Sequence, residues 1–160
     1  MVDNKKQNVS VRMSNSDLKR IKEIAQRINV RDSDVFRFAV KSTLTKLTPL
    51  NDEHVRGKDL LPVFLEGGSE LASYFDLDTS RLERIINDGV DNPGKLVDRE
   101  DIELLVMAGI QESYVYMRLK NLLQKQPEHQ EVSRALREYL LEKYIGGIDI
   151  VNMKPLAESA

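Results

Sequence analysis

The feature of this 160-residue chain that most limits its fold is one alternating stretch near the N-terminus. Residues 7–14 read QNVSVRMS, in which polar and apolar side chains alternate with the period of a half-buried β-strand. No second stretch of this kind follows it. The next apolar residues recur at helical spacing instead; they are Leu18, Ile21, Ile24, Ala25 and Ile28. The sequence therefore predicts a strand with no neighbouring strand to pair with.

Two helices are predicted after this strand. Ser14 and Asp17 stand three residues apart, as in a capping box, and predict a helix over about residues 15–29. Asn29 can end that helix in the left-handed conformation. A second helix is predicted from the segment RDSD, residues 31–34, to Pro49. Its expected buried face consists of Val35, Phe36, Ala39, Val40, Thr43, Leu44 and Leu47.

A unit of one strand and two helices needs a partner. Its roughly 41 residues bury too little apolar surface to fold alone, and an isolated strand leaves amides and carbonyls unpaired. We therefore expect a homodimer, with the two strands paired antiparallel and four helices covering their apolar face. The expected dimer core comprises Val9, Val11, Met13, Leu18, Ile21, Val35, Phe36 and Ala39.

The outward face of such a two-stranded ribbon carries Asn8, Ser10 and Arg12. A ribbon of this kind fits the major groove of DNA. Arg can form paired hydrogen bonds with guanine, Asn can do so with adenine, and Ser can serve either base. We therefore predict base contacts from these three residues. The alternative is a unit that only dimerises, with a merely solvated outer face.

Charge is divided unevenly along the chain. Residues 1–58 hold 13 Lys+Arg and 7 Asp+Glu, a net of +6, whereas residues 59–160 hold 11 and 19, a net of −8. A basic N-terminal part on an acidic body suggests that only the former meets a polyanion.

The order of these features over about residues 7–48 resembles the ribbon-helix-helix family, that of the Arc and methionine repressors. The resemblance implies an obligate dimer, base contacts from the strand and phosphate contacts from the start of the second helix. By position, the phosphate clamp falls at Arg31, Asp32 and Ser33, of which Arg31 and Ser33 are the expected phosphate contacts. Lys5 and Lys6, on the arm before the strand, are expected to add further phosphate contacts.

The start of the second helix also departs from the family pattern. Small polar residues are usual there, whereas this chain has Asp32 and Asp34. A helix N-terminus favours anions through its free amides and its dipole. These carboxylates can cap their own helix, at a cost to phosphate affinity.

The predicted fold class is mainly α: an N-terminal ribbon-helix-helix domain and a C-terminal all-α domain. We place the first domain at residues 1–48 and a linker at 49–58, because the linker is polar and holds one Pro and one Gly. The acidic helical domain, residues 59–160, would sense an effector or form higher oligomers. Its helices are predicted over about residues 59–66, 69–75, 79–88, 98–124 and 128–145.

Two features of the acidic domain leave alternatives open. Residues 68–88 fit the apolar template of a helix-turn-helix, with Asp76 at the turn. A second DNA reader and a structural corner both remain possible, and the net −8 charge favours the corner. Four tyrosines could line an effector pocket or simply pack in the core; they are Tyr114, Tyr116, Tyr139 and Tyr144.

Catalytic and targeting signals are missing from the sequence. There is no phosphate-binding loop, dinucleotide fingerprint, H-E-x-x-H or G-x-S-x-G. His54 and His129 are isolated, and cysteine is absent. The sequence also shows no apolar signal segment or membrane span. We predict a cytoplasmic protein that is not an enzyme and has no cofactor or metal.

The leading hypothesis is a sequence-specific DNA-binding transcriptional regulator that acts as a repressor. It would bind double-stranded DNA as a homodimer or tetramer, with a small-molecule or protein effector on the acidic domain. The alternative is a dimeric protein-interaction module of the antitoxin or plasmid-partition and relaxosome accessory type, whose acidic body binds a protein partner.

Overall fold

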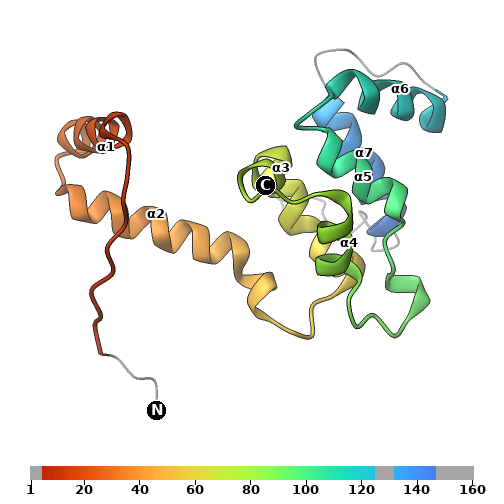
Figure 1. Ribbon diagram of the computed structural model, residues 1–160, viewed down its shortest axis with the longest axis horizontal. Coiled ribbons are helices and arrows are strands. Elements are labelled where there is room, and N and C mark those ends of the chain that lie inside the picture. The colour runs from red at the N-terminus through yellow and green to blue at the C-terminus, as the bar shows by residue number, and fades with distance from the viewer. Residues whose placement is uncertain (1–4, 125–131, 147–160) are drawn as a thin grey trace, which may run out of the picture. The chain divides into compact units, whose positions relative to one another are not determined.

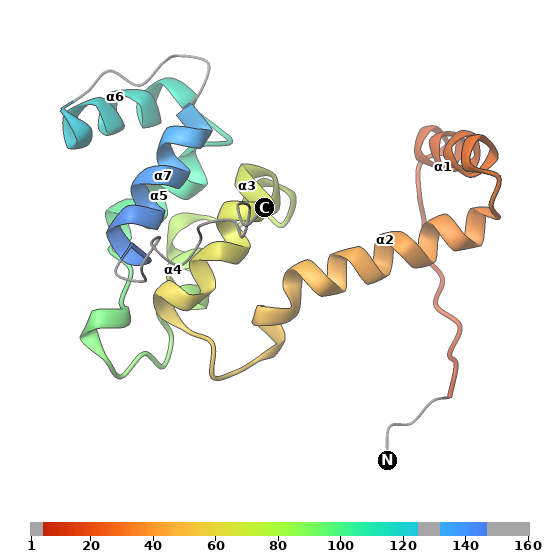
Figure 2. The same ribbon diagram turned by 180° about the vertical axis from the view of Figure 1, so that it is seen from behind.

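The structure is a computed structural model that describes residues 5–124 and 132–146, and all regular elements within these ranges are helical (Figures 1 and 2). The mainly-α prediction is confirmed. None of the described helices combines the length and apolar character that a membrane span requires. The α-helices are α1 (Asn15–Ile28), α2 (Asp32–Leu47), α3 (Leu61–Tyr74), α4 (Thr79–Asn87), α5 (Arg99–Met107), α6 (Glu112–Leu123) and α7 (Val132–Tyr144). Short 3-10 helices are η1 (Thr48–Asn51), η2 (Gly57–Leu60) and η3 (Pro93–Lys95).

The predicted N-terminal strand is not formed. Residues 7–14 have neither helix nor strand, and no sheet occurs in the part of the chain that the structure describes. Figure 1 shows this segment as an unwound trace leading into α1. The predicted ribbon-helix-helix fold class is therefore wrong. Alternation of side chains shows which residues could share a face, but a strand also needs a neighbour to complete its hydrogen bonds.

The chain divides into two units, Met1–Thr45 and Lys46–Ala160, here called unit 1 and unit 2. In unit 1, the predicted ends of the first helix are confirmed. The Ser14 hydroxyl accepts a hydrogen bond from the Asp17 amide at 3.1 Å and donates one to the Asp17 carboxylate at 2.7 Å. At the other end Asn29 adopts the left-handed conformation, with φ 57° and ψ 50°. Local side-chain chemistry thus sets both ends of α1.

Unit 1 has almost no core of its own. Between residues 5 and 45, Ala25 is the one buried side chain. Ordering a residue's backbone costs about 1–2 kcal/mol, and a single buried methyl group does not offset that cost over two helices. Unit 1 therefore needs additional apolar burial to be stable.

Unit 2 is built around α5, which packs against α3, α4, α6 and α7. Five of the nine residues of α5 are buried, including Ile102 and the charged Asp101. The core around it comprises Leu60, Leu61, Val63, Phe64, Leu82, Ile86, Val97, Ile102, Leu104, Leu105, Val106, Val115, Leu119, Val132, Leu136 and Leu140. Unit 2 therefore has the buried apolar surface that unit 1 lacks.

Two helix boundaries in unit 2 differ from the prediction. The backbone of α3 continues through Gly67 and Gly68, where a break was predicted. Each glycine costs about 1 kcal/mol in a helix, and burial of Leu61, Phe64 and Ala72 on the same helix outweighs that cost. The predicted single helix over 98–124 instead breaks at a turn after Met107. For the predicted helix at 128–145, residues 128–131 lie outside the described part.

The turn between α3 and α4 lies at Asp76, the position that the helix-turn-helix template gave. Asp76 adopts the left-handed conformation, with φ 51°. Asp78 then caps α4, because its Oδ1 accepts a hydrogen bond from the Arg81 amide at 2.7 Å. The side chain of Asn87, at the end of α4, holds the segment before α5. Its Nδ2 donates to the Val97 carbonyl at 2.8 Å, and its Oδ1 accepts from the Val97 amide at 3.0 Å.

Candidate functional site

The three residues predicted to contact bases lie on the unwound segment before α1. Asn8, Ser10 and Arg12 are exposed, and none of them has a hydrogen bond or ion pair with another described residue. Their donors and acceptors are thus open to an external partner. The structure places them on one short segment but gives them no fixed scaffold.

Apolar side chains alternate with these polar ones and are also uncovered. Val9 is 84% exposed, Val11 76% and Met13 37%. Fully burying one such side chain is worth about 1.5–3 kcal/mol. Val9 and Val11, two of the predicted dimer-core residues of this segment, are therefore largely uncovered by the described part of the chain, whereas Met13 is partly covered.

The same holds for the apolar residues of α1 and α2. Ile21, Val35 and Phe36 are half-buried, whereas Leu18 and Ala39 are exposed. The expected buried face of α2 is largely open in the single chain. The large exposed apolar side chains on these two helices and the turn between them are Leu18, Ile24, Ile28, Val30, Phe38, Val40 and Leu44. Apolar surface left exposed in quantity usually marks an interaction site, so these side chains are candidates for an interface.

The start of α2 holds a cluster of one carboxylate and two guanidinium groups. Asp34 forms a paired contact with Arg31, with the Arg31 Nε and Nη2 each 3.1 Å from an oxygen of the carboxylate. Arg37 Nη1 donates to the same carboxylate at 3.0 Å. Mainly through the hydrogen bond between them, the pKa of Asp34 is lowered from its ordinary value and the pKa of Arg31 is raised. Arg31 is therefore already engaged by an acid of its own helix.

Asp34 also shapes the end of its helix. The Arg31 amide donates a hydrogen bond to Asp34 Oδ2 at 3.3 Å, which is the reciprocal half of a capping box. Sequence reasoning recognised that Asp34 could cap the helix but missed its contacts with both arginines. Their spacing, three residues before and three after Asp34, is a signal that could have revealed them.

The remaining predicted phosphate contacts are dispersed. Lys5 and Lys6 lie on the unwound segment, and Ser33 lies in the first turn of α2; all three are exposed. Residues 5–45 carry 10 Lys+Arg against 4 Asp+Glu, a net of +6. A unit with that charge and with open hydrogen-bonding side chains is suited to bind a polyanion.

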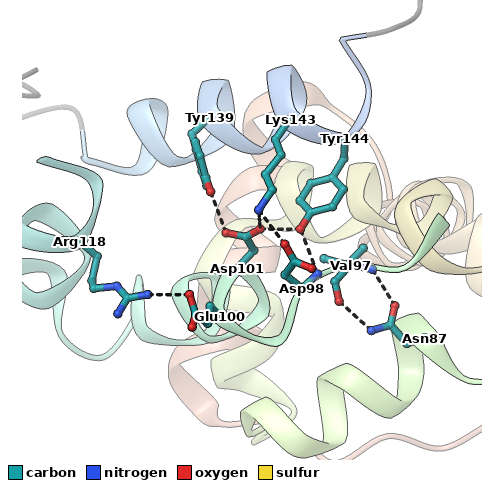
Figure 3. A network of polar contacts seen from close by, with 9 residues as sticks. All are labelled: Asn87, Val97, Asp98, Glu100, Asp101, Arg118, Tyr139, Lys143 and Tyr144. Atoms are coloured by element: carbon teal, nitrogen blue, oxygen red, sulfur yellow. Dashed lines mark hydrogen bonds and ion pairs between the residues drawn. The ribbon is translucent and has the colours of Figure 1, made fainter. Parts of the chain in front are cut away.

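Among the described residues of unit 2, Asp101 is 2% exposed and accepts several hydrogen bonds (Figure 3). Three side chains of α7 point toward it. Tyr139 donates at 3.0 Å, Lys143 at 2.7 Å and Tyr144 at 2.5 Å. Lys143 also donates to Asp98 at 2.8 Å. This network fastens α7 to α5 through charged hydrogen bonds, which are about twice as strong as neutral ones.

The network also shifts the proton affinities of its members. Burial and the hydrogen bond to Asp101 raise the pKa of Tyr144 above its ordinary value. Partial burial lowers the pKa of Lys143. The hydrogen bonds to Asp101 and Asp98 raise this pKa by more, so its net shift is upward. Lys143 is therefore charged and Tyr144 neutral at ordinary pH. The network is best described as a structural clamp, because its contacts all join α7 to α5 and to Asp98 at the start of α5.

Three of the four tyrosines donate hydrogen bonds to carboxylates. Tyr139 and Tyr144 bind Asp101, and Tyr114 donates to Glu103 at 3.3 Å. Unit 2 does have a surface cleft of about 480 Å³ between α3, α5 and α7. It mixes apolar and charged side chains; the lining is Phe64, Leu65, Glu66, Gly67, Glu70, Leu105, Ala108, Ser133, Arg134, Leu136 and Arg137.

The helix-turn-helix-like corner uses its outward polar groups internally. Arg81 donates to the Asp76 carbonyl at 3.0 Å. Arg99, at the start of α5, donates to Ser80 at 3.0 Å and pairs with Glu83. These contacts favour the structural corner over a second DNA reader, because Ser80 and Arg81 at the start of α4 already bind within unit 2.

No protein-family model, curated protein or solved structure matches the chain.

Proposed function

We propose that the chain is a DNA-binding transcriptional regulator that dimerises through unit 1 and acts as a repressor. The observation that carries the proposal is the contrast between the two units. Unit 1 combines a net charge of +6 over residues 5–45 with an apolar surface left uncovered. Unit 2, with a net charge of −7 over residues 46–160, has its own core.

The exposed apolar side chains of unit 1 suit dimerisation, and its positive charge suits DNA binding. Its uncovered apolar side chains are suited to meet those of a second copy, since the same face then covers itself in both chains. Its cations would neutralise phosphates, which supply most of the affinity for DNA. The bound dimer would repress transcription by occupying the DNA site that polymerase needs. This would take place in the cytoplasm.

Base recognition in this proposal comes from Asn8, Ser10 and Arg12. They are exposed, without partners among the described residues, and of the types that bind base edges in the major groove. Arg31, Ser33, Lys5 and Lys6 would contribute phosphate contacts, which position the protein without reading sequence. DNA fragments from the source genome that are retained by the purified protein would identify the site.

The test compares Arg12→Ala with Arg20→Ala, which removes the same charge from α1. Arg12→Ala should lose about 1–3 kcal/mol of specific binding to the retained site, measured by fluorescence anisotropy. Both variants should bind unrelated DNA equally. If Arg12→Ala and Arg20→Ala bind the retained site alike, direct readout by Arg12 is wrong. If the wild-type chain shifts no DNA even at low salt, the whole proposal fails.

A second candidate function is a protein-interaction module, favoured by one feature of unit 2. Tyr74 is 85% exposed and Phe75 53% exposed at the end of α3, and their rings meet edge to face with centroids 5.3 Å apart. Exposed aromatic residues are typical of protein interfaces. Salt separates the two functions, because DNA affinity falls steeply as salt rises, whereas binding through apolar aromatic side chains does not.

A further inference from the structure

We propose that Asp34 competes with DNA phosphate for Arg31 and Arg37, and thereby limits the affinity of unit 1 for DNA. This inference rests on the proposed function and adds a regulatory residue to the same surface. Its basis is the shared carboxylate at the start of α2, where one acid holds two cations.

The geometry makes Asp34 a close substitute for a phosphate. The guanidinium of Arg31 meets the carboxylate with two parallel hydrogen bonds of 3.1 Å, which is also the way a guanidinium grips a phosphate. Arg37, three residues after Asp34, donates a third hydrogen bond to the same carboxylate. Arg31, a proposed phosphate contact, and the nearby Arg37 are thus both bound to a carboxylate while DNA is absent.

The contact is weak enough to be exchanged. The side chains of Arg31, Arg37 and Asp34 are 77%, 64% and 37% exposed. Exposed ion pairs contribute little, because water and salt screen them. A phosphate brought close by the other cations of unit 1 can therefore replace the carboxylate. Asp34 then remains near the phosphate as a repelling charge, so the exchange lowers the net affinity.

Asp32 provides a matched control within the same helical turn. It is exposed, carries the same charge and lies two residues from Asp34. Yet it forms no ion pair with any residue that the structure describes. Asp32→Asn therefore reports the general effect of removing one acid beside DNA, and Asp34→Asn reports that effect plus the release of two arginines.

The experiment measures binding of the full-length protein to a genomic fragment that it retains, by fluorescence anisotropy from 50 to 200 mM salt. Each phosphate contact contributes about 0.9 to the slope of log affinity against log salt. Asp34→Asn should steepen the slope by up to about 1.8, the limit reached when wild type keeps both arginines on Asp34 in the complex. The affinity advantage of Asp34→Asn over wild type should therefore shrink by up to roughly 12-fold across this fourfold range of salt. Asp32→Asn should show no comparable steepening.

A double-mutant comparison tests whether the arginines carry the effect. In an Arg31→Ala, Arg37→Ala background, Asp34→Asn should gain no more affinity than Asp32→Asn. Asn or Ser at position 34 keeps an oxygen that can accept the hydrogen bond from the Arg31 amide. Asp34→Ser therefore serves as a second uncharged variant that retains this cap. Circular dichroism checks that each variant keeps its helices.

The outcomes separate the two proposals. If the wild type binds DNA and Asp34→Asn matches Asp32→Asn in slope and affinity, the competition is wrong and DNA binding stands. The same holds if the gain persists without both arginines. If neither the wild type nor any variant binds DNA at 50 mM salt, the proposed function fails and the competition fails with it.

Discussion

Asp101 shows how one residue can fix the arrangement of two helices. It is the buried charged side chain among the described residues, and burial of a charge is tolerated only with compensating bonds. Tyr139, Lys143 and Tyr144 supply them, all from α7. No signal in the sequence distinguished Asp101 from Glu100, because both lie in the first turn of a helix where the dipole alone explains acids.

Replacing Asp101 should therefore destabilise unit 2. Asp101→Ala leaves two tyrosine hydroxyls and part of the Lys143 charge without their acceptor, and breaking a buried pair on one side costs about 3–5 kcal/mol. We expect a loss of about 3 kcal/mol, since Lys143 is partly exposed and can reach water. Urea denaturation measures the free energy of unfolding.

Glu100→Ala is the control for this substitution. Glu100 pairs with Arg118 at 3.3 Å but is 79% exposed, so its loss should cost no more than about 1 kcal/mol. Equal losses for the two variants would show that the Asp101 network does not stabilise the contact between α5 and α7.

At the scale of elements, the sequence revealed helix ends better than helix continuity. Ser14 and Asn29 act at the ends of α1 as predicted, because capping depends on chemistry within a few residues. The break between α5 and α6 was missed. Periodicity did not show that α6 packs mainly against α7 while α5 contacts four helices.

Capping also gives a prediction for α4. Asp78 is its N-cap, with a 2.7 Å bond from the Arg81 amide, and replacing such a residue by Ala costs about 1 kcal/mol. Asp78→Ala should lower the unfolding free energy of unit 2 by about that amount, and Asp78→Ser should retain most of the stability. Asp91→Ala, in the exposed loop after α4, removes the same charge and should have no measurable effect on the urea midpoint.

At the scale of the whole molecule, the candidate site was only partly predictable. The sequence indicated which side chains of unit 1 are polar, basic or apolar, and these are the residues that the structure leaves exposed. It did not reveal that residues 7–14 form no strand, because strand formation depends on a neighbour that no local pattern supplies. It also did not reveal that Asp34 occupies Arg31, since the choice among nearby charged partners depends on rotamers.

The uncovered apolar side chains of unit 1 give the last prediction. Val11 is 76% exposed, so Val11→Asp removes almost no contact within one chain, and any effect on assembly reports a contact between chains. Loss of at least about 1.5 kcal/mol of burial in each of two copies should raise the dimer dissociation constant about 100-fold or more, as measured by sedimentation equilibrium. Met117→Asp, 64% exposed on α6 of unit 2, should leave the constant unchanged. A wild-type chain that sediments as a monomer at all concentrations would show that something other than a second copy covers this surface.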